Sequence, residues 1–458
     1  MRGLKMVVIL SGGAVMAWLI YTVLSSPVPL LAWLQHPESS WLLTQGENPH
    51  PTTLRLPPVK PLSAVALIGR KLFYDPELSG SGKLSCASCH NPQHSYAPVN
   101  ALSVQRGGAD IQQFGVRAVP TLTYLYRQGD FSIGPANEAL EDVTLSDKLK
   151  HSKLVKVTRK TTLNTQISAA NLVPQGGLFW DGRADTLQQQ ALGPLLNPLE
   201  MDAGSTKILA DKLAYSVYIP ELVQLFGPAV QVDRNLLLVE ALFALSRFQI
   251  EDPSFHAFTS KYDAWLQGQA RFTPAELSGY LVFNDPNKGN CAACHLDQPT
   301  RDRLPPLFTD SEYEALGVPR NPNIPANHDQ HYDDLGVCGP YRTDLKNQTQ
   351  YCGMFLTPTL RNAATRQAFF HNGAYHTLNQ VLNFYALRDV APQNIYPVDT
   401  HGKVDQYNDI PATLRANVDV SDAPFNRKLN DPPAFNAQDA ADLIAFLRTL
   451  NDGYAGAH

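Results

Sequence analysis

The sequence predicts a mainly α-helical fold of two related domains with long irregular connections. Three observations support this prediction: apolar residues recur at helical spacing, no run alternates as a half-buried β-strand would, and one short pattern occurs in both halves of the chain. The expected helices cover 62–73, 184–196, 205–216, 233–249, 273–283, 376–387 and 437–450. Pro- and Gly-rich stretches separate them, which accounts for the irregular part.

The repeated pattern indicates a duplicated domain. A Gly is followed four residues later by a Phe and then by an Asp-Pro pair, first from Gly69 to Pro76 and again from Gly279 to Pro286. Each copy precedes a Cys-x-x-Cys-His motif, and this shared placement favours duplication over chance.

Domain boundaries follow from the repeat and from the chain length. A chain of 458 residues is long enough for two or three hydrophobic cores. We expect an N-terminal domain over 62–255, with an insertion at 131–170, and a C-terminal domain over 256–458. Residues 26–61 are rich in Pro with scattered polar residues, which is typical of a spacer between a membrane and a domain.

Residues 1–25 have the pattern of an export signal. Arg2 and Lys5 precede a stretch from Met6 to Ser25 that contains no charged residue. A span of about 20 apolar residues can cross a bilayer, so an uncleaved transmembrane anchor is favoured over a cleavable signal peptide, whose apolar region is usually shorter. Basic residues ahead of the span place the N-terminus in the cytoplasm and the globular part outside it.

Two Cys-x-x-Cys-His motifs predict two covalently bound haem c groups. Two cysteines at this spacing can form thioether bonds to both vinyl groups of a haem, and the adjacent histidine then binds the iron. A zinc site would need four ligands, and a thioredoxin-like dithiol would need a strand–helix unit. The attaching cysteines are Cys86, Cys89, Cys291 and Cys294, and the iron ligands are His90 and His295. The two domains are therefore expected to be cytochrome c-like.

The charge of the chain excludes nucleic acid as a partner, and its two remaining cysteines bear on the cellular compartment. Charged residues form 17% of the chain and the net charge is −5, so no global basic field points to nucleic acid. Cys338 and Cys352 are left after haem attachment. In an oxidising compartment they are expected to form a disulfide, the alternative being two buried thiols.

Three further stretches resemble the bacterial di-haem cytochrome c peroxidase and MauG superfamily. They are Leu72-Phe73-Tyr74-Asp75-Pro76, Phe179-Trp180-Asp181-Gly182-Arg183-Ala184 and Thr357-Pro358-Thr359-Leu360-Arg361-Asn362. The resemblance runs from about residue 62 to about residue 452, so it covers both domains. It implies a catalytic N-terminal haem and an electron-transfer C-terminal haem.

The resemblance implies a set of residues around the N-terminal haem. By their position after the Trp motif, Trp180 lies between the haems, Gln190 and Pro194 line the distal pocket, and Glu200 is the acid–base group. The chemistry requires such a group independently, because cleavage of the O–O bond moves a proton from one peroxide oxygen to the other.

The resting state of this haem is expected to be open. Classical family peroxidases block the iron with a second histidine, but in this chain only His94 stands in that region, four residues after His90. That spacing is too short for His94 to reach the opposite haem face. We expect a five-coordinate iron that needs no reductive activation, as in MauG-like members.

The C-terminal haem is expected to have a tyrosine ligand. In the family this ligand follows the His of a Phe-His-x-Gly motif by fourteen residues, and it is Met in the classical peroxidases and Tyr in MauG-like proteins. In this chain the His is His371 and the ligand position is Tyr385. A phenolate favours ferric iron and lowers the potential. Met354 is the rival ligand, because it precedes the Thr357 stretch.

The family also holds a calcium ion between its domains, with an Asn side chain and two backbone carbonyls. Thr365 and Gln367 match the carbonyl positions, but Ala118 stands where the Asn would be. Because the amide is missing, the expectation of calcium rests on the two backbone carbonyls alone.

Three functions are consistent with these residues. The leading one is a periplasmic di-haem peroxidase, tethered to the inner membrane, that reduces hydrogen peroxide with electrons from a small periplasmic donor protein, a cytochrome c or a cupredoxin. The second is a MauG-like enzyme that oxidises residues of a partner protein. The third is a non-enzymatic electron-transfer cytochrome, against which Glu200 argues, because a carrier has no use for a proton shuttle.

Overall fold

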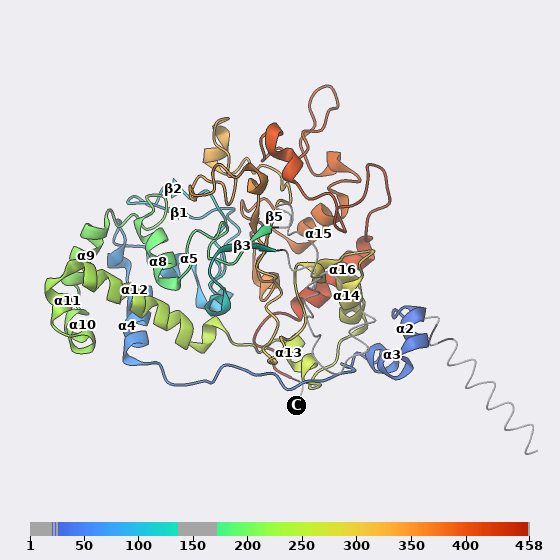
Figure 1. Cartoon of the computed structure of the whole chain (residues 1–458), viewed down its shortest axis with the longest axis horizontal. Helices are drawn as coiled ribbons and strands as arrows, with labels where there is room; N and C mark the ends of the chain where they lie inside the picture. Colours follow the sequence, from blue (N-terminus) through green and yellow to red (C-terminus); the bar gives the residue numbers. More distant parts are fainter. Residues whose placement is uncertain (1–20, 22, 24–25, 136–171, 457–458) are drawn as a thin grey trace, which may run out of the picture.

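The computed structural model describes residues 21, 23, 26–135 and 172–456 (Figure 1). The segment expected to be an anchor or signal, 1–25, and most of the insertion 131–170 therefore lie outside the described residues. Within the described part, no helix has the length and apolar character needed to cross a membrane.

The N-terminal half is built from helices packed around one apolar cluster. The helices are α4 Ala64–Phe73, α5 Cys86–Cys89, α8 Leu187–Leu196, α9 Thr206–Ala214, α10 Ile219–Phe226, α11 Ala229–Val232 and α12 Arg234–Glu251. The four long helices expected from periodicity are confirmed. The sequence did not predict α10 and α11, since elements of 8 and 4 residues are too short to show a helical period. Phe73, Leu237 and Phe248 are fully buried at the centre of the cluster.

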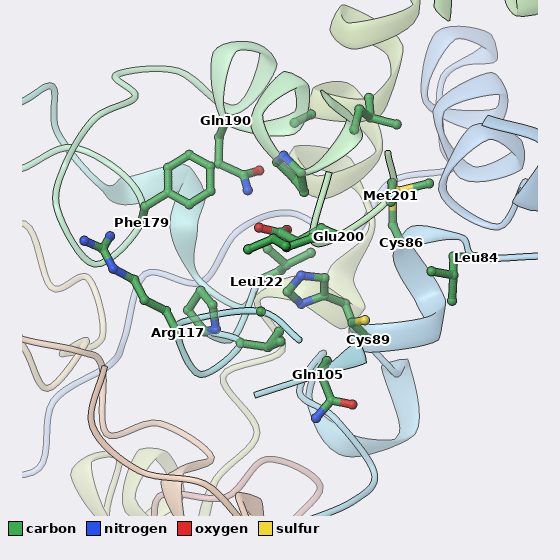
Figure 2. A pocket seen from close by; sticks show the side chains of 18 of the residues that line it. Leu84, Cys86, Cys89, Gln105, Arg117, Leu122, Phe179, Gln190, Glu200 and Met201 are labelled. Carbon is green, nitrogen blue, oxygen red and sulfur yellow. The ribbon is translucent and has the colours of Figure 1, made fainter. Parts of the chain in front are cut away.

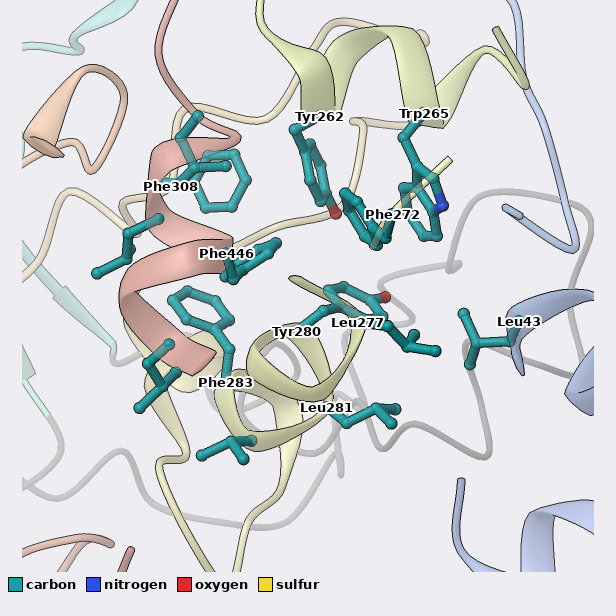
Figure 3. Close-up of a cluster of buried hydrophobic side chains, with 14 of the residues drawn as sticks. Leu43, Tyr262, Trp265, Phe272, Leu277, Tyr280, Leu281, Phe283, Phe308 and Phe446 are labelled. Atoms are coloured by element: carbon teal, nitrogen blue, oxygen red, sulfur yellow. The ribbon is translucent and has the colours of Figure 1, made fainter. Parts of the chain in front are cut away.

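The C-terminal half has its own helices and its own aromatic core. The helices are α13 Lys261–Leu266, α14 Pro274–Asn284, α15 Leu378–Leu387 and α16 Ala437–Arg448. Trp265 and Phe272 stack with ring centroids 4.6 Å apart, and Phe446 packs against the same group (Figure 3). The proposed boundary at 255/256 falls between this cluster and the N-terminal one.

The repeated glycine has the same role in both halves. In the first, α4 crosses α12 so closely that a Cβ on Gly69 would overlap the carbonyl of Ala244. In the second, α14 crosses α16, and a Cβ on Gly279 would overlap the carbonyl of Asp442. Both helix pairs therefore depend on a residue without a side chain, which supports a duplicated design.

The Pro-rich segment after residue 25 is packed on the C-terminal half, unlike the spacer expected over 26–61. It forms α2 Leu30–Gln35 and α3 Pro37–Thr44 and then runs extended toward α4 (Figure 1). The carbonyl of Gly46 accepts hydrogen bonds from the Trp265 indole at 2.9 Å and from the Phe272 amide at 2.8 Å. Leu43 and Leu54 are buried in the aromatic core, and this burial outweighs the Pro-rich composition.

Short strand pairs and single turns complete the described part. Three antiparallel pairs join β1 Arg106–Gly107 to β2 Gln113–Phe114, β3 Ser132–Pro135 to β4 Leu172–Gln175, and β5 Tyr313–Glu314 to β6 Phe355–Leu356. Strands of two to four residues are too short for an alternating pattern to reveal them. The 3-10 helices are Pro76–Leu78, Pro92–His94, Leu125–Arg127, Pro253–Phe255, Cys291–Ala293, Pro325–His328, Thr349–Tyr351, Ala363–Thr365, Pro392–Asn394 and Ala412–Asn417. The disulfide between Cys338 and Cys352 is confirmed, with Cα atoms 5.1 Å apart.

Candidate active site

The first Cys-x-x-Cys-His motif opens onto a large cavity in the N-terminal half. Cys86, Cys89 and His90 line this space of about 1230 Å³, part of which is open to solvent. His90 Nδ1 lies 3.0 Å from the carbonyl oxygen of Tyr96. Because a carbonyl can only accept, Nδ1 carries the proton and Nε2 is left to bind iron. Burial lowers the pKa of His90 to about 4, so the ring is neutral, as an iron ligand must be. These residues fit a covalently attached haem.

The second motif has the same local geometry. Cys291 and Cys294 precede His295, whose Nδ1 lies 2.9 Å from the carbonyl oxygen of Phe308. Burial lowers the pKa of His295 to about 4 as well. The matching ring orientation in both halves is the arrangement expected of two haem-binding histidines.

Tyr385 and Met354 are placed in different surroundings. Tyr385, on α15, packs against the same cluster as Cys291, and its ring stacks on Phe425 with centroids 5.3 Å apart. Desolvation, followed by the nearby Cys291 and Cys294, raises the pKa of the Tyr385 phenol above its usual value. A phenolate there would need the charge of a metal ion to stabilise it. Met354 packs instead in the cluster around the disulfide of Cys338.

The distal residues expected from the sequence line one cavity. Gln190 and Pro194 lie on α8, and Glu200 follows the end of that helix (Figure 2). Asn197 Nδ2 donates to Glu200 Oε1 at 2.5 Å, and the amide of Gly108 donates to the Glu200 carbonyl at 2.7 Å. Glu200 is thus fixed at both its side chain and its backbone.

The electrostatics of Glu200 suit a group that gains and loses a proton. Glu200 has a large accessible surface, but it lines the cavity, where many protein atoms surround the carboxyl. Desolvation therefore raises the pKa of the carboxyl, while Asn197, Arg183 and Arg117 limit the rise. A carboxyl whose pKa is moved toward neutrality can act as both acid and base.

Trp180 lies where the two halves meet. Its indole Nε1 donates to the carbonyl of Ala118 at 2.8 Å, and the Ala118 amide donates to the carbonyl of His371 at 2.7 Å. The amide of Leu356 donates to the Trp180 carbonyl at 3.0 Å. Trp180 also lines the cavity of His90, so hydrogen bonds connect this cavity to the C-terminal half.

Comparison with known proteins agrees with this geometry. A family model described as di-haem cytochrome c peroxidase matches residues 63–271. The methylamine utilization protein MauG of Paracoccus denitrificans is 32% identical over 335 residues, which span 70% of this chain and 74% of that protein. The chain belongs to the di-haem cytochrome c peroxidase and MauG family.

Other members of the family support this assignment over most of the chain. The cytochrome c551 peroxidase of Nitrosomonas europaea is 28% identical over 415 residues, which cover 86% of this chain and 84% of that protein. The solved structure of the diheme peroxidase BthA from Burkholderia thailandensis is 34% identical, covers 88% of each chain and has a TM-score of 0.71. The present chain, as a member of this family, is therefore a di-haem oxidoreductase. Its two Cys-x-x-Cys-His motifs match the haem c groups that the family implies.

The structure also reveals a buried charge network that the sequence did not predict. Arg117 donates to Asp181 and to Asp334, each at 2.7 Å, and Arg183 donates to Asp181 at 2.8 Å. Burial alone would raise the pKa of Asp334, but Arg117 outweighs it and the pKa is lowered. Two of these residues belong to the Trp180 motif, whereas Asp334 comes from the C-terminal half with no local pattern to mark it.

Two features of classical family members were expected to be changed in this chain: the second histidine that blocks the N-terminal haem and the calcium site. His94 ends a 3-10 helix and is not one of the residues that line the described cavity. The open haem face stays a prediction. The carbonyl oxygen of Gln367 already accepts a hydrogen bond from His376 Nδ1, 2.9 Å away. The hydroxyl of Thr365 donates to the Asn362 carbonyl. A calcium ion at Thr365 and Gln367 stays a prediction.

Proposed function

We propose that this protein reduces hydrogen peroxide to water at the haem held by His90. Two electrons and two protons are consumed for each peroxide. The electrons come from a small periplasmic donor protein, a cytochrome c or a cupredoxin. The observation that carries the proposal is Glu200, which is held by Asn197 in the cavity that His90 lines. When bound, the haem supplies an iron that takes up peroxide and accepts the oxidising equivalents.

The protein's own residues would perform the proton chemistry. Glu200 takes a proton from one peroxide oxygen and returns it to the other, which leaves as water. Gln190 and Pro194 restrict the space beside Glu200. Because Gln190 is only 8% exposed, its side chain is held by the surrounding protein. The hydrogen bond from Asn197 and the charges of Arg183 and Arg117 limit the rise in the Glu200 pKa that burial causes.

The second haem would store part of the oxidising power. We assign Tyr385 as a residue that would hold the second haem together with His295, supported by its packing against the same cluster as Cys291. We assign Trp180 as the electron relay between the haems, supported by its contact with the cavity of His90 and by its hydrogen bonds through Ala118 to the C-terminal half. A low-potential ferric centre is the expected consequence of a phenolate ligand.

Replacing Tyr385 tests this ligand directly. Tyr385→Met is expected to raise the potential of the second haem by roughly 0.2 V or more, because a thioether stabilises ferrous iron where a phenolate stabilises ferric iron. Spectroelectrochemical titration of the full protein measures the shift. Tyr375→Phe is a matched control, since Tyr375 is a neighbouring phenol whose buried hydroxyl has no hydrogen-bond partner. The assignment would be refuted if the potential of the second haem shifted in Tyr375→Phe and stayed unchanged in Tyr385→Met.

A periplasmic location is part of the proposal. The disulfide of Cys338 and Cys352 is typical of an oxidising compartment. The charge-free stretch 6–25 would supply export and tethering to the inner membrane as an uncleaved anchor, or export alone as a cleaved signal peptide.

A MauG-like oxidation of a partner protein is the second candidate, and it is favoured by Tyr385 and by the 32% identity to MauG. Steady-state turnover separates the two. Fast peroxide reduction with a reduced small cytochrome, compared with a chemical reductant alone, supports the peroxidase. Equal slow rates with both would reject it and favour the maturase. A purely electron-carrying cytochrome would reduce no peroxide with either.

A further inference from the structure

A loop from the C-terminal half contributes Tyr341 to the lining of the cavity in the N-terminal half. This loop comprises residues 334–354, and the disulfide between Cys338 and Cys352 closes most of it. At one end, Asp334 binds Arg117 through two hydrogen bonds of 2.7 Å. Further along, Arg342 Nη1 donates to the carbonyls of Asp181 and Gly182 at 3.2 and 2.9 Å. The loop is thus fixed to the opposite half at both places.

Tyr341 lies between these two attachments, at the boundary of the cavity. It is one of the residues that line the space shared by His90 and Glu200, yet 37% of it is exposed. Because part of this space is open to solvent, an exposed side chain that lines it is positioned to limit access to the cavity. Burial raises the pKa of the Tyr341 phenol, Arg117 limits the rise, and the Glu200 carboxylate adds to it.

Two guanidinium groups hold the Tyr341 ring in place. The centroid of the ring is 5.2 Å from the guanidinium carbon of Arg117 and 5.2 Å from that of Arg183. Arg117 is itself fixed, because its side chain is 8% exposed and is paired with Asp181, which is fully buried. Cation–π contacts to these two partners favour this position of the ring.

We propose that Tyr341 is a specificity-determining residue that narrows the entrance of the cavity, so that hydrogen peroxide enters and hydroperoxides with bulky organic groups are excluded. The inference rests on the proposed function, because it concerns access to the haem face where peroxide would react. Hydrogen peroxide is little larger than water, whereas an aryl hydroperoxide carries a ring about as large as that of Tyr341.

Ligand binding to the full-length haem-loaded protein tests the inference without relying on turnover. Stopped-flow absorption gives the association rate constants of cyanide, a small ligand, and of phenylimidazole, a bulky one. In Tyr341→Ala the ratio of the phenylimidazole constant to the cyanide constant is expected to rise at least roughly tenfold, because the steric barrier acts on the larger ligand alone. The preference for hydrogen peroxide over cumene hydroperoxide should fall in parallel.

Two controls make the result specific. Tyr341→Phe should keep the wild-type ratio, since the ring and not the hydroxyl fills the entrance. Tyr215→Ala removes a tyrosine that is 85% exposed and does not line the cavity, and it should leave the ratio unchanged. An unchanged ratio in Tyr341→Ala, with cyanide still bound, would overturn the inference and leave the proposed function standing. Failure of the wild type to bind cyanide would remove the open haem face on which both proposals depend.

Discussion

Glu200→Gln is expected to lower kcat for peroxide reduction by about 10²–10⁴-fold, the usual contribution of a positioned acid–base group. In the wild type, Asn197 donates to Glu200 Oε1 at 2.5 Å. The glutamine amide has the size of the carboxyl, and its oxygen can still accept this hydrogen bond. It cannot accept and return a proton. Steady-state turnover with a reduced small cytochrome, together with the haem content of the variant, measures the effect. Turnover equal to that of the wild type would exclude Glu200 as the proton shuttle.

A second variant changes the position of Glu200 without changing its chemistry. A Cβ on Gly107 would overlap the backbone of Leu199 and Glu200, so Gly107→Ala should displace the carboxyl and lower kcat in the same direction. Gly129→Ala is the matched control, because its Cβ would meet open space. If Gly107→Ala retains full activity, the placement of Glu200 does not matter and the proposed role weakens.

Arg361→Met is expected to lower the free energy of unfolding by about 3–5 kcal/mol, since it leaves a buried carboxylate without its partner. Arg361 is 1% exposed and donates to both oxygens of Asp263, at 2.7 and 2.9 Å. Its Nε also donates to the carbonyl of Pro306 at 2.7 Å. Chemical denaturation of the haem-loaded protein measures the loss.

Two comparisons identify the cause of that loss. Lys207→Met breaks the ion pair of Lys207 and Asp211, in which Lys207 is 83% exposed, and should change stability little. Combining Arg361→Met with Asp263→Asn should recover part of the stability, because the uncompensated charge is gone. If the double variant is no more stable than Arg361→Met, the buried charge is not the source of the effect.

Features encoded in short stretches of sequence could be predicted. The long helices show their period in the residues themselves, and each haem motif specifies its own chemistry within five positions. The placement of Glu200 in the cavity of His90 followed from the resemblance to a family, since a single Glu carries no pattern of its own.

Contacts between distant segments could not be predicted in this way. Arg117 and Asp334 are separated by 217 positions, and neither has a neighbour that marks the pair. Tyr341 lies in an irregular loop, and only the fold brings it to Arg183. The Pro-rich segment was interpreted as a spacer because composition describes what a segment does alone, whereas Leu43 and Leu54 are buried by residues beyond position 260.

The docking of this N-terminal segment has a consequence for the order in which the protein matures. The hydrogen bond from the Trp265 indole to Gly46 joins residues 219 positions apart, and other partners in the same core extend to Leu450. The segment is synthesised before the rest of the described fold, but its binding surface is complete only when the chain has been made as far as Leu450. The C-terminal core therefore closes late, as expected for contacts of such high sequence separation. Cys291 and Cys294 would remain accessible for haem attachment until that closure.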